Sequence, residues 1–426
     1  MQRNIKSTFS SLNLGFYGML CTLFLTSCQP KKADQNESVF YSVDDTSQSI
    51  IDSLEVELND LYELGHITGF SVTILTKASV LYAGGYGFAD VAKEKPYQAN
   101  TIQNIASISK TLIGLSLLKA QEEKLIDLDD DINLHLPFKV LNPHYPDKPI
   151  TIRHLAGHTS TILDTDYYGR ESYILAQGED ASQYINADDD QQFKSFEERE
   201  SLDDFLKNLL SEEGKWYEET NYIDSEPGSV YEYSNVGATL AAYIVQQVSG
   251  ISFPEFTKRY ILSPLGMTSS GWSFDEVDMT KHTRMYSTRD TLLPRYFLVT
   301  YPDGGFITSS LDLGKYLQEL LRGKLGQGSI LSKESYEEIF TAQFPDVKNL
   351  DGEEEVPSGI FMDLQDNGLI GHTGGDPGVV SYMFFDPESE LGRILIINTS
   401  ITTQACYDQF RSIWDSLKKY GLRLNQ

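Results

Sequence analysis

Ser107-Ile-Ser-Lys110 is the stretch that decides how this chain is to be understood, and two further motifs follow it in a fixed order. These are Tyr233-Ser-Asn235 and His372-Thr-Gly-Gly375. Together they supply a serine hydroxyl, a lysine one helical turn away, a second proton carrier, a polar side chain and a glycine-rich strand. Acyl transfer through a serine ester needs these parts. We therefore predict a serine hydrolase.

The surroundings of Ser107 distinguish it from other serines that precede a lysine at the same spacing. The pattern recurs at Ser116-Leu-Leu-Lys119 and Ser416-Leu-Lys-Lys419. Ser107 precedes an apolar run, Leu112 to Leu118, that predicts a buried helix with Ser107 in its first turn. Residues three apart lie on one helix face, roughly 5–6 Å apart at Cβ, so Lys110 can reach the Ser107 hydroxyl. We expect the deeper serine to be core. The C-terminal one lies on a helix with an apolar face, and we interpret the lysines after it as solvated charges near the chain end.

Tyr233 and Asn235 precede a second predicted helix. Residues 238–248 favour a helix, and Gly250 is placed to cap its C-terminus. We expect both side chains on a loop that faces a cleft, although an ordinary capped turn would give the same pattern. A second Tyr-x-Asn match, Tyr184-Ile-Asn186, runs into an acidic segment and is interpreted as a solvated loop.

The third motif begins a region of strand-like sequence. The turn from Pro387 to Gly392 separates apolar runs at 379–385 and 394–398, which predicts a hairpin. Glycine on an edge strand lets a substrate backbone approach closely. We therefore predict that the four motif residues bind substrate; they are His372, Thr373, Gly374 and Gly375.

The ordered motifs, with segments such as Gly85–Asp90 and Thr151–Ser160, resemble the serine β-lactamase and penicillin-binding-protein superfamily. The nearest group is the class C β-lactamase-related one, which contains D-alanyl-D-alanine peptidases, D-aminopeptidases and esterases. The resemblance runs from about Gly69 to Leu417. It implies a two-lobe α+β (α/β) fold, with an antiparallel sheet flanked by N- and C-terminal helices and a helix-rich lobe beside it. The active site would lie between the lobes.

The resemblance also implies roles for the motif residues and no cofactor. Ser107 would attack a carbonyl, and Lys110 and Tyr233 would share its proton, with either as the general base. A nearby ammonium is expected to lower the pKa of Tyr233. Backbone N–H groups of Ser107 and Gly375 would form the oxyanion hole. Asn235 would hold the substrate amide or orient Lys110, and water would release the acyl group.

Three departures from the family pattern lie near the expected site. His372 stands where β-lactamases proper usually carry Lys, and Thr161 stands where family members commonly have Gly. Ser358-Gly-Ile-Phe-Met362 replaces an aromatic Tyr-Gly-x-Gly-Trp segment. Since histidine is charged only near or below pH ~6.5 unless it is perturbed, a permanent cation for a substrate carboxylate is missing. This favours a peptidase or esterase over a β-lactamase.

The N-terminus predicts export. Arg3 and Lys6 precede an apolar stretch, which is typical of a signal peptide over residues 1–27. Leu25-Thr-Ser-Cys28 resembles the bacterial lipobox, so we expect cleavage before Cys28 and lipidation of its thiol. A plain secretory signal or a short membrane anchor is the alternative.

The predicted order is a signal peptide, a polar tether over residues 28–48 and a hydrolase domain over residues 49–422. Lipidation of Cys28 would anchor the protein on a membrane of the bacterial cell envelope, facing the periplasm or the cell surface.

Composition excludes several other classes. A formal charge of −28 argues against a nucleic-acid partner. Only Cys406 would remain after removal of Cys21 and lipidation of Cys28, so no internal disulfide is expected. His154 and His158 have a spacing that can bind zinc, but no Glu follows His154, and we predict no metal site.

Two functional readings follow. The favoured one is a hydrolase of a D-amino-acid peptide, amide or ester, with a peptidoglycan stem peptide as one possible substrate and a carboxylesterase as a variant. The other is a catalytically weak protein that binds or senses peptidoglycan. The acidic, aromatic segment from Asp164 to Glu226 is either a lid over the cleft or a surface excursion.

Overall fold

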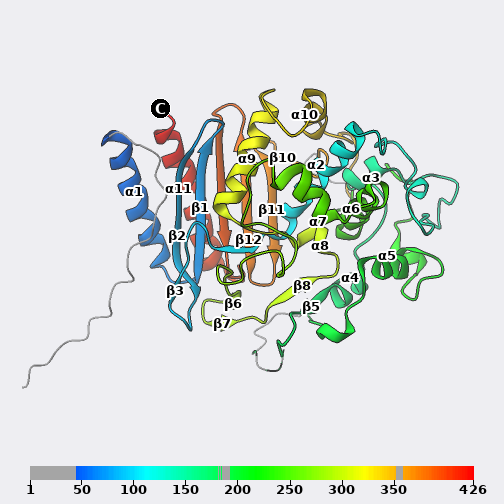
Figure 1. Cartoon of the computed structure of the whole chain (residues 1–426), viewed down its shortest axis with the longest axis horizontal. Coiled ribbons are helices and arrows are strands. Elements are labelled where there is room, and N and C mark those ends of the chain that lie inside the picture. The colour runs from blue at the N-terminus through cyan, green and yellow to red at the C-terminus, as the bar shows by residue number, and fades with distance from the viewer. Residues whose placement is uncertain (1–44, 181, 183, 185–191, 352–357) are drawn as a thin grey trace, which may run out of the picture. The chain divides into compact units, whose positions relative to one another are not determined.

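The computed structural model describes residues 45–426 except 181, 183, 185–191 and 352–357. The predicted signal peptide, Cys28 and all but the last four residues of the tether lie outside the described residues. The centre of the fold is a seven-stranded antiparallel sheet (Figure 1). Its strands, in spatial order, are β10 (Asp363–Leu364), β11 (Ile370–Asp376), β12 (Val379–Asp386), β13 (Leu391–Ile397), β1 (Gly69–Thr76), β2 (Val80–Asp90) and β3 (Lys95–Pro96).

The two terminal helices cover one face of this sheet, as predicted. Helix α1 (Asp45–Tyr62) packs against α11 (Gln404–Leu424), and both lie on the same side of the strands in Figure 1. Apolar residues at helical spacing, among them Ile51, Leu54 and Leu58, face the sheet and are fully buried. Strands β1 and β13, from opposite ends of the described chain, pair near the middle of the sheet.

The opposite face is covered by α9 (Ser310–Lys324) and, beyond it, by the predicted helix-rich region. Inward residues of the sheet such as Leu75 and Ile394 share one hydrophobic core with Leu112 and Leu240 of that region. The helices there are α2 (Ser109–Glu122), α3 (Ile152–Ala156), α4 (Asp166–Glu171), α5 (Leu202–Leu210), α6 (Asn235–Ser249), α7 (Phe253–Thr257), α8 (Tyr301–Gly304) and α10 (Lys333–Ile339). The two predicted lobes are thus joined by a continuous core.

Three short strand pairs link the helical region to the sheet. They are β4 (Ile102–Asn104) with β9 (Ile307–Ser309), β5 (Tyr173–Leu175) with β8 (Tyr296–Leu298), and β6 (Tyr286–Thr288) with β7 (Thr291–Leu292). The first pair matters for the site, because the chain passes from β4 directly into the turn that carries Ser107.

The C-terminal cap predicted for the second helix is confirmed. Helix α6 ends at Gly250, whose φ of 70° is the left-handed conformation that glycine adopts without steric cost. No single helix among the described residues has the length and apolar character needed to cross a membrane; α6 with the following turns meets that test only as a pair bent by 79°.

Candidate active site

Ser107 lies in a 3₁₀ turn, Ala106–Ile108, immediately before α2. The helix was expected to include Ser107, but it begins at Ser109. The difference arises at Ala106, whose φ of 50° is left-handed and rare for a residue with a side chain. This turn leaves Ser107 partly exposed, while its neighbours Ala106 and Ile108 are buried.

Lys110 is fully buried and points at the serine. Its Nζ donates to Ser107 Oγ at 3.0 Å and to the carbonyl oxygen of Asp303 at 2.7 Å. Burial lowers the pKa of Lys110, but Tyr233 and the Asp303 carboxylate raise it, and the net pKa is raised. Lys110 is therefore a charged hydrogen-bond donor to the nucleophile in the resting site.

Tyr233 lies beside this pair, with the Lys110 ammonium 5.1 Å from its ring centroid. The hydroxyl oxygen is buried and has no hydrogen-bond partner of ordinary geometry among the described residues. Burial raises its pKa, whereas Lys110 and Ser107 lower it, and the net pKa is raised. The expected lowering of the pKa by the ammonium is therefore present, but desolvation of the phenol outweighs it.

His158 packs against the ring of Tyr233. The two rings are stacked, with centroids 4.4 Å apart, and His158 Nδ1 accepts a hydrogen bond from the backbone N–H of Ser234 at 3.2 Å. Burial, Lys110 and His372 all lower the pKa of His158 well below its ordinary value, so the imidazole is neutral. In the sequence, His158 stood out only for its zinc-like spacing from His154.

Asn235 is the first residue of α6 rather than part of the preceding loop, and Asp164 fixes it. Asp164 Oδ2 accepts from the side-chain and backbone nitrogens of Asn235 at 2.7 and 2.8 Å, and Oδ1 accepts from Val236 N at 2.9 Å. Lys110 makes no hydrogen bond to Asn235 in the described part of the chain. No motif pointed to Asp164, which is buried and stabilises the N-terminus of the helix.

The third motif lies on β11, and its glycines have different surroundings. A Cβ on Gly374 would lie 2.3 Å from the carbonyl oxygen of Ile105 and 2.4 Å from Ser381 Oγ, whereas a Cβ on Gly375 would meet nothing within 4 Å. The strand therefore packs its backbone against the residues leading to Ser107 at Gly374 and stays open at Gly375.

The other edge of β11 is also open. Strand β12 pairs with the whole of β11, but β10 pairs only with Ile370 and Gly371. His372 is buried, lies 6.3 Å from the Tyr233 ring between centroids, and its Nδ1 is 2.5 Å from the carbonyl oxygen of Thr373. In the described chain, no strand pairs with this edge of β11 from His372 onward.

The segment from Asp164 to Glu226 contributes to the site, as only the tertiary structure could reveal. Tyr168 donates from its hydroxyl to Asp303 Oδ2 at 3.2 Å, and Tyr173 donates to Asp376 Oδ1 at 2.7 Å. Burial raises the pKa of Asp303 to about 7 and that of Asp376 to about 6, although the charge of Lys110 lowers both. The described part of this segment thus lines the site through Tyr168 and Tyr173.

Two of the departures noted in the sequence occupy left-handed backbone positions. Thr161 has a φ of 70° and Phe361 a φ of 51°, where residues with a Cβ are strained by roughly 1–3 kcal/mol. Phe361 uses its side chain to meet the edge of the His158 ring, with centroids 5.3 Å apart.

The two histidines with zinc-like spacing serve different purposes. His154 Nδ1 accepts from the backbone N–H of Thr151 at 3.1 Å and closes a capping box at the start of α3, while His158 faces Tyr233. The described residues contain no group of three or more histidine, cysteine or carboxylate side chains placed to hold a metal ion.

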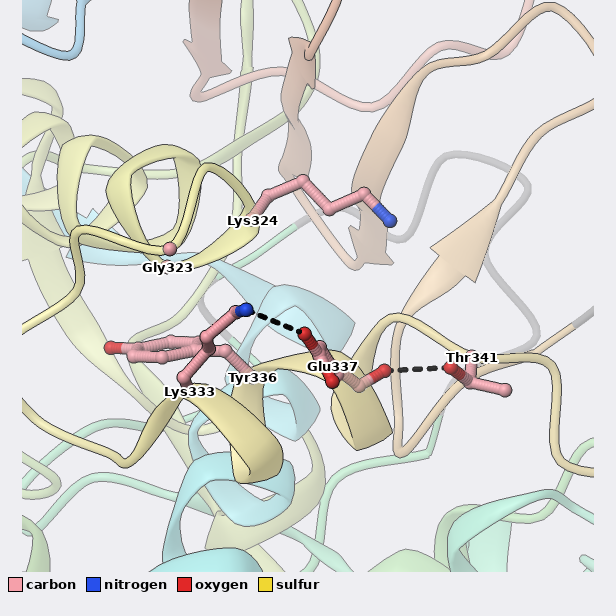
Figure 2. A pocket seen from close by; sticks show the side chains of 7 residues that line it. Gly323, Lys324, Lys333, Tyr336, Glu337 and Thr341 are labelled. Atoms are coloured by element: carbon pink, nitrogen blue, oxygen red, sulfur yellow. Dashed lines mark hydrogen bonds and ion pairs between the residues drawn. The ribbon is translucent and has the colours of Figure 1, made fainter.

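A surface cavity of about 340 Å³ lies between the end of α9 and α10 (Figure 2). Lys333 pairs with Glu337 at 3.5 Å on its wall, and Thr341 donates to the Glu337 carbonyl oxygen at 2.6 Å. None of its lining residues belongs to the three motifs, so the candidate site rests on the geometry around Ser107 and not on this cavity.

Comparison with known proteins agrees with this geometry. A profile described as "Beta-lactamase" matches residues 52–415. The chain belongs to the beta-lactamase family. This family of serine hydrolases includes penicillin-binding-protein homologues, and the seven-stranded sheet with packed terminal helices is its fold.

Relatives of this beta-lactamase family member are distant. Protein flp of Staphylococcus aureus (strain N315) is 26% identical over 363 residues, which cover 83% of this chain and 63% of the relative. Penicillin-binding protein 4* of Bacillus subtilis (strain 168) is 26% identical over 355 residues, covering 76% and 68%. The chain thus spans less than two thirds of the length of the flp proteins.

Among solved structures, D-amino acid amidase from Ochrobactrum anthropi SV3 matches with a TM-score of 0.62 and 19% identity. The match covers 87% of this chain and 99% of the amidase. At that identity the comparison establishes the fold shared by the two proteins.

Proposed function

We propose that this chain is a serine hydrolase that forms an acyl-enzyme at Ser107 and acts on a D-amino-acid peptide, amide or ester. The hydrogen bond from the buried Lys110 ammonium to Ser107 Oγ, at 3.0 Å, carries the proposal. A fully buried lysine is costly to a fold unless it is paired, and here it is aimed at a partly exposed serine.

The reaction begins when Ser107 Oγ attacks the substrate carbonyl carbon. The serine proton passes to the Lys110–Tyr233 pair, once that pair has given up a proton, and the carbonyl oxygen becomes an oxyanion between the backbone N–H groups of Ser107 and Gly375. Collapse of this intermediate breaks the bond to the leaving group, which takes the proton. Water then attacks the ester, and the acid product and Ser107 are released.

Support for the substrate class comes from the relatives and from His372. The similar proteins include a penicillin-binding protein and a D-amino acid amidase. His372 replaces a permanently charged lysine, which disfavours substrates that rely on a carboxylate anchor. A peptidoglycan stem peptide remains within the proposed class, as does an ester.

The proposed location is the bacterial cell envelope, with the chain anchored through lipidated Cys28. The lipobox-like Leu25-Thr-Ser-Cys28 supports this proposal. Each buried CH₂ of an acyl chain contributes about 0.8 kcal/mol, so several chains would hold the protein stably on a membrane. Mass analysis of the membrane-extracted protein tests it, since an unmodified N-terminus that retains residues 1–27 would contradict the proposal.

The test of the catalytic proposal uses the full chain in mild detergent. Wild type, Ser107→Ala and Lys119→Ala would be incubated with a fluorescent fluorophosphonate and a fluorescent penicillin, and labelling would be followed by intact mass. Lys119 is the control because it lies on the same helix and pairs with Glu122 at 3.2 Å.

We expect labelling of the wild type and the Lys119 variant and none of the Ser107 variant. Penicillin labelling would point to peptidoglycan peptides, and labelling by the fluorophosphonate alone would point to an esterase or aminopeptidase. Absence of serine-dependent labelling by both probes would contradict the proposal and favour a peptidoglycan-binding protein.

A further inference from the structure

Asp376 ends strand β11, one residue after the predicted oxyanion donor, and borders the turn of the nucleophile. Its Oδ2 lies 3.1 Å from the point where a Cβ on Gly304 would stand, and Cα of Ala106 lies 3.7 Å from the same point. Ala106 directly precedes Ser107. The carboxylate and the turn that carries the serine therefore border the same point, although neither the motifs nor the mechanism above uses Asp376.

This carboxylate has spare capacity to accept hydrogen bonds. Tyr173 donates to Oδ1 at 2.7 Å, and the described residues supply Asp376 with no second side-chain donor. An ionised carboxylate offers about four acceptor positions. Because the strand edge from His372 to Asp376 has no neighbouring strand, a ligand backbone can reach this position.

The charges around Asp376 favour a cationic ligand. Lys110 is the cation that acts on Asp164, Asp303 and Asp376 alike, so one ammonium is shared by three carboxyl groups. His158, the other basic group packed against Tyr233, is neutral. A negatively charged substrate terminus would be repelled here, and a positively charged one would be attracted.

A second observation indicates that a ligand completes the site. The Tyr233 hydroxyl is buried beside Ser107 and Lys110 but makes no hydrogen bond of ordinary geometry in the described chain, which is costly for a polar atom. A substrate seated at Ser107 would supply that partner with its leaving group, while its acyl half would extend along β11 towards Asp376.

We propose that Asp376 binds the protonated α-amino group of the substrate, so that the acyl donor is an aminoacyl amide or peptide with a free N-terminus. In an α-amino acid only two bonds separate the carbonyl carbon from the amino nitrogen. Consecutive strand residues are about 3.3 Å apart, so an oxyanion held at Gly375 places the ammonium near the next residue. The inference rests on the proposed hydrolase function and adds the substrate class.

The test compares two substrates that differ only in this group, D-alanine p-nitroanilide and N-acetyl-D-alanine p-nitroanilide, with the full chain. For the wild type at pH 7 we expect kcat/KM to be at least tenfold higher for the free amine, which corresponds to about 1.4 kcal/mol. Asp376→Asn should bring the ratio close to one. Asp386→Asn makes the same chemical change at the far end of β12 and should preserve the ratio.

A wild-type ratio near one, or a ratio that Asp376→Asn leaves unchanged, would overturn the inference. If Asp376→Asn does not fold, the ratio of kcat/KM measured for the wild type still tests the inference. The groups facing Asp376 are Tyr168, Tyr173, Asp303 and Lys110. The tyrosines stay neutral and Lys110 stays charged, whereas both carboxyls gain protons as the pH falls, so the ratio should decline between pH 7 and pH 5. A flat ratio over that range would overturn the inference.

The two proposals fail in different ways. Cleavage of both substrates at similar rates would leave the hydrolase function standing and remove the role of Asp376. Serine-dependent labelling with no cleavage of either p-nitroanilide would also count against an aminoacyl substrate. Absence of both labelling and cleavage would overturn the hydrolase proposal itself, and with it this inference.

Discussion

The imidazole of His158 stacks on the phenol ring of Tyr233, with ring centroids 4.4 Å apart and planes inclined by 30°. Phe361 makes a T-shaped contact with the imidazole, with ring centroids 5.3 Å apart, and Ser234 donates its backbone N–H to Nδ1. The proton carrier of the proposed reaction is therefore positioned by a neutral histidine that does not touch the nucleophile.

Replacing His158 should slow acylation by misplacing Tyr233. We expect His158→Ala to lower the second-order rate of fluorophosphonate labelling about 10²-fold, since small misplacements of a catalytic group cost this much. The variant should also shift the pH profile to lower pH, because water admitted beside Tyr233 reduces the desolvation that raises its pKa. His135→Ala, which removes a histidine paired with Asp130, is the control. An unchanged profile with a lower melting temperature would show a merely structural role.

The acylation rate should rise with pH. The pKa values of both Lys110 and Tyr233 are raised, so the pair holds its protons at neutral pH and the fraction able to accept the Ser107 proton is small. That fraction grows tenfold per pH unit below the pKa. We expect the labelling rate to increase about tenfold per unit between pH 6 and pH 8. A rate that is constant over this range would show that the pair has already lost a proton.

The two glycines of the third motif should differ in how far replacement by alanine destabilises the fold. Gly374→Ala drives a Cβ to 2.3 Å from the Ile105 carbonyl oxygen, so we expect it to lower the free energy of unfolding by about 3 kcal/mol. Gly375→Ala has open space and should change that free energy by less than about 1 kcal/mol. Denaturant unfolding of the matched pair is the measurement. Equal destabilisation would mean that β11 does not pack against the nucleophile turn at Gly374.

Asp303 should make the stability of the fold depend on pH. Its pKa is raised by burial from 3.8 to about 7, so between those values the folded chain holds a proton that the unfolded chain lacks. The contribution of the Asp303 carboxyl to the free energy of unfolding is therefore present at low pH. It is lost as the pH rises towards 7, by about 1.4 kcal/mol per pH unit. The free energy of unfolding of Asp303→Asn, measured relative to that of the wild type, should therefore rise by about 3 kcal/mol between pH 5 and pH 8. Unfolding curves at both pH values test this, and a constant difference would contradict it.

Local patterns were sufficient for several of the elements and for the three motifs. The apolar run after Lys110 predicted α2, and Gly250 predicted the end of α6. The spacing of Ser107 and Lys110 put the two side chains within reach of each other, and the structure shows the hydrogen bond. The same spacing at Ser116 and Lys119 gives none, because Ser116 donates to Leu112 and Lys119 pairs with Glu122. The start of α2 was misplaced by two residues, since nothing in the sequence reveals that Ala106 is left-handed.

The sequence by itself determined the candidate catalytic residues, because their recognition depends on short-range spacing. The ordered motifs also indicated the family by resemblance, and that resemblance implied the sheet with its terminal helices. Only the tertiary structure brought Asp164, Asp303 and Asp376 around one lysine and placed His158 against Tyr233. No motif pairs these residues with one another, and they lie on segments up to about two hundred positions apart. Their pKa values and contacts arise from burial and proximity, and both of these exist only after the chain has folded.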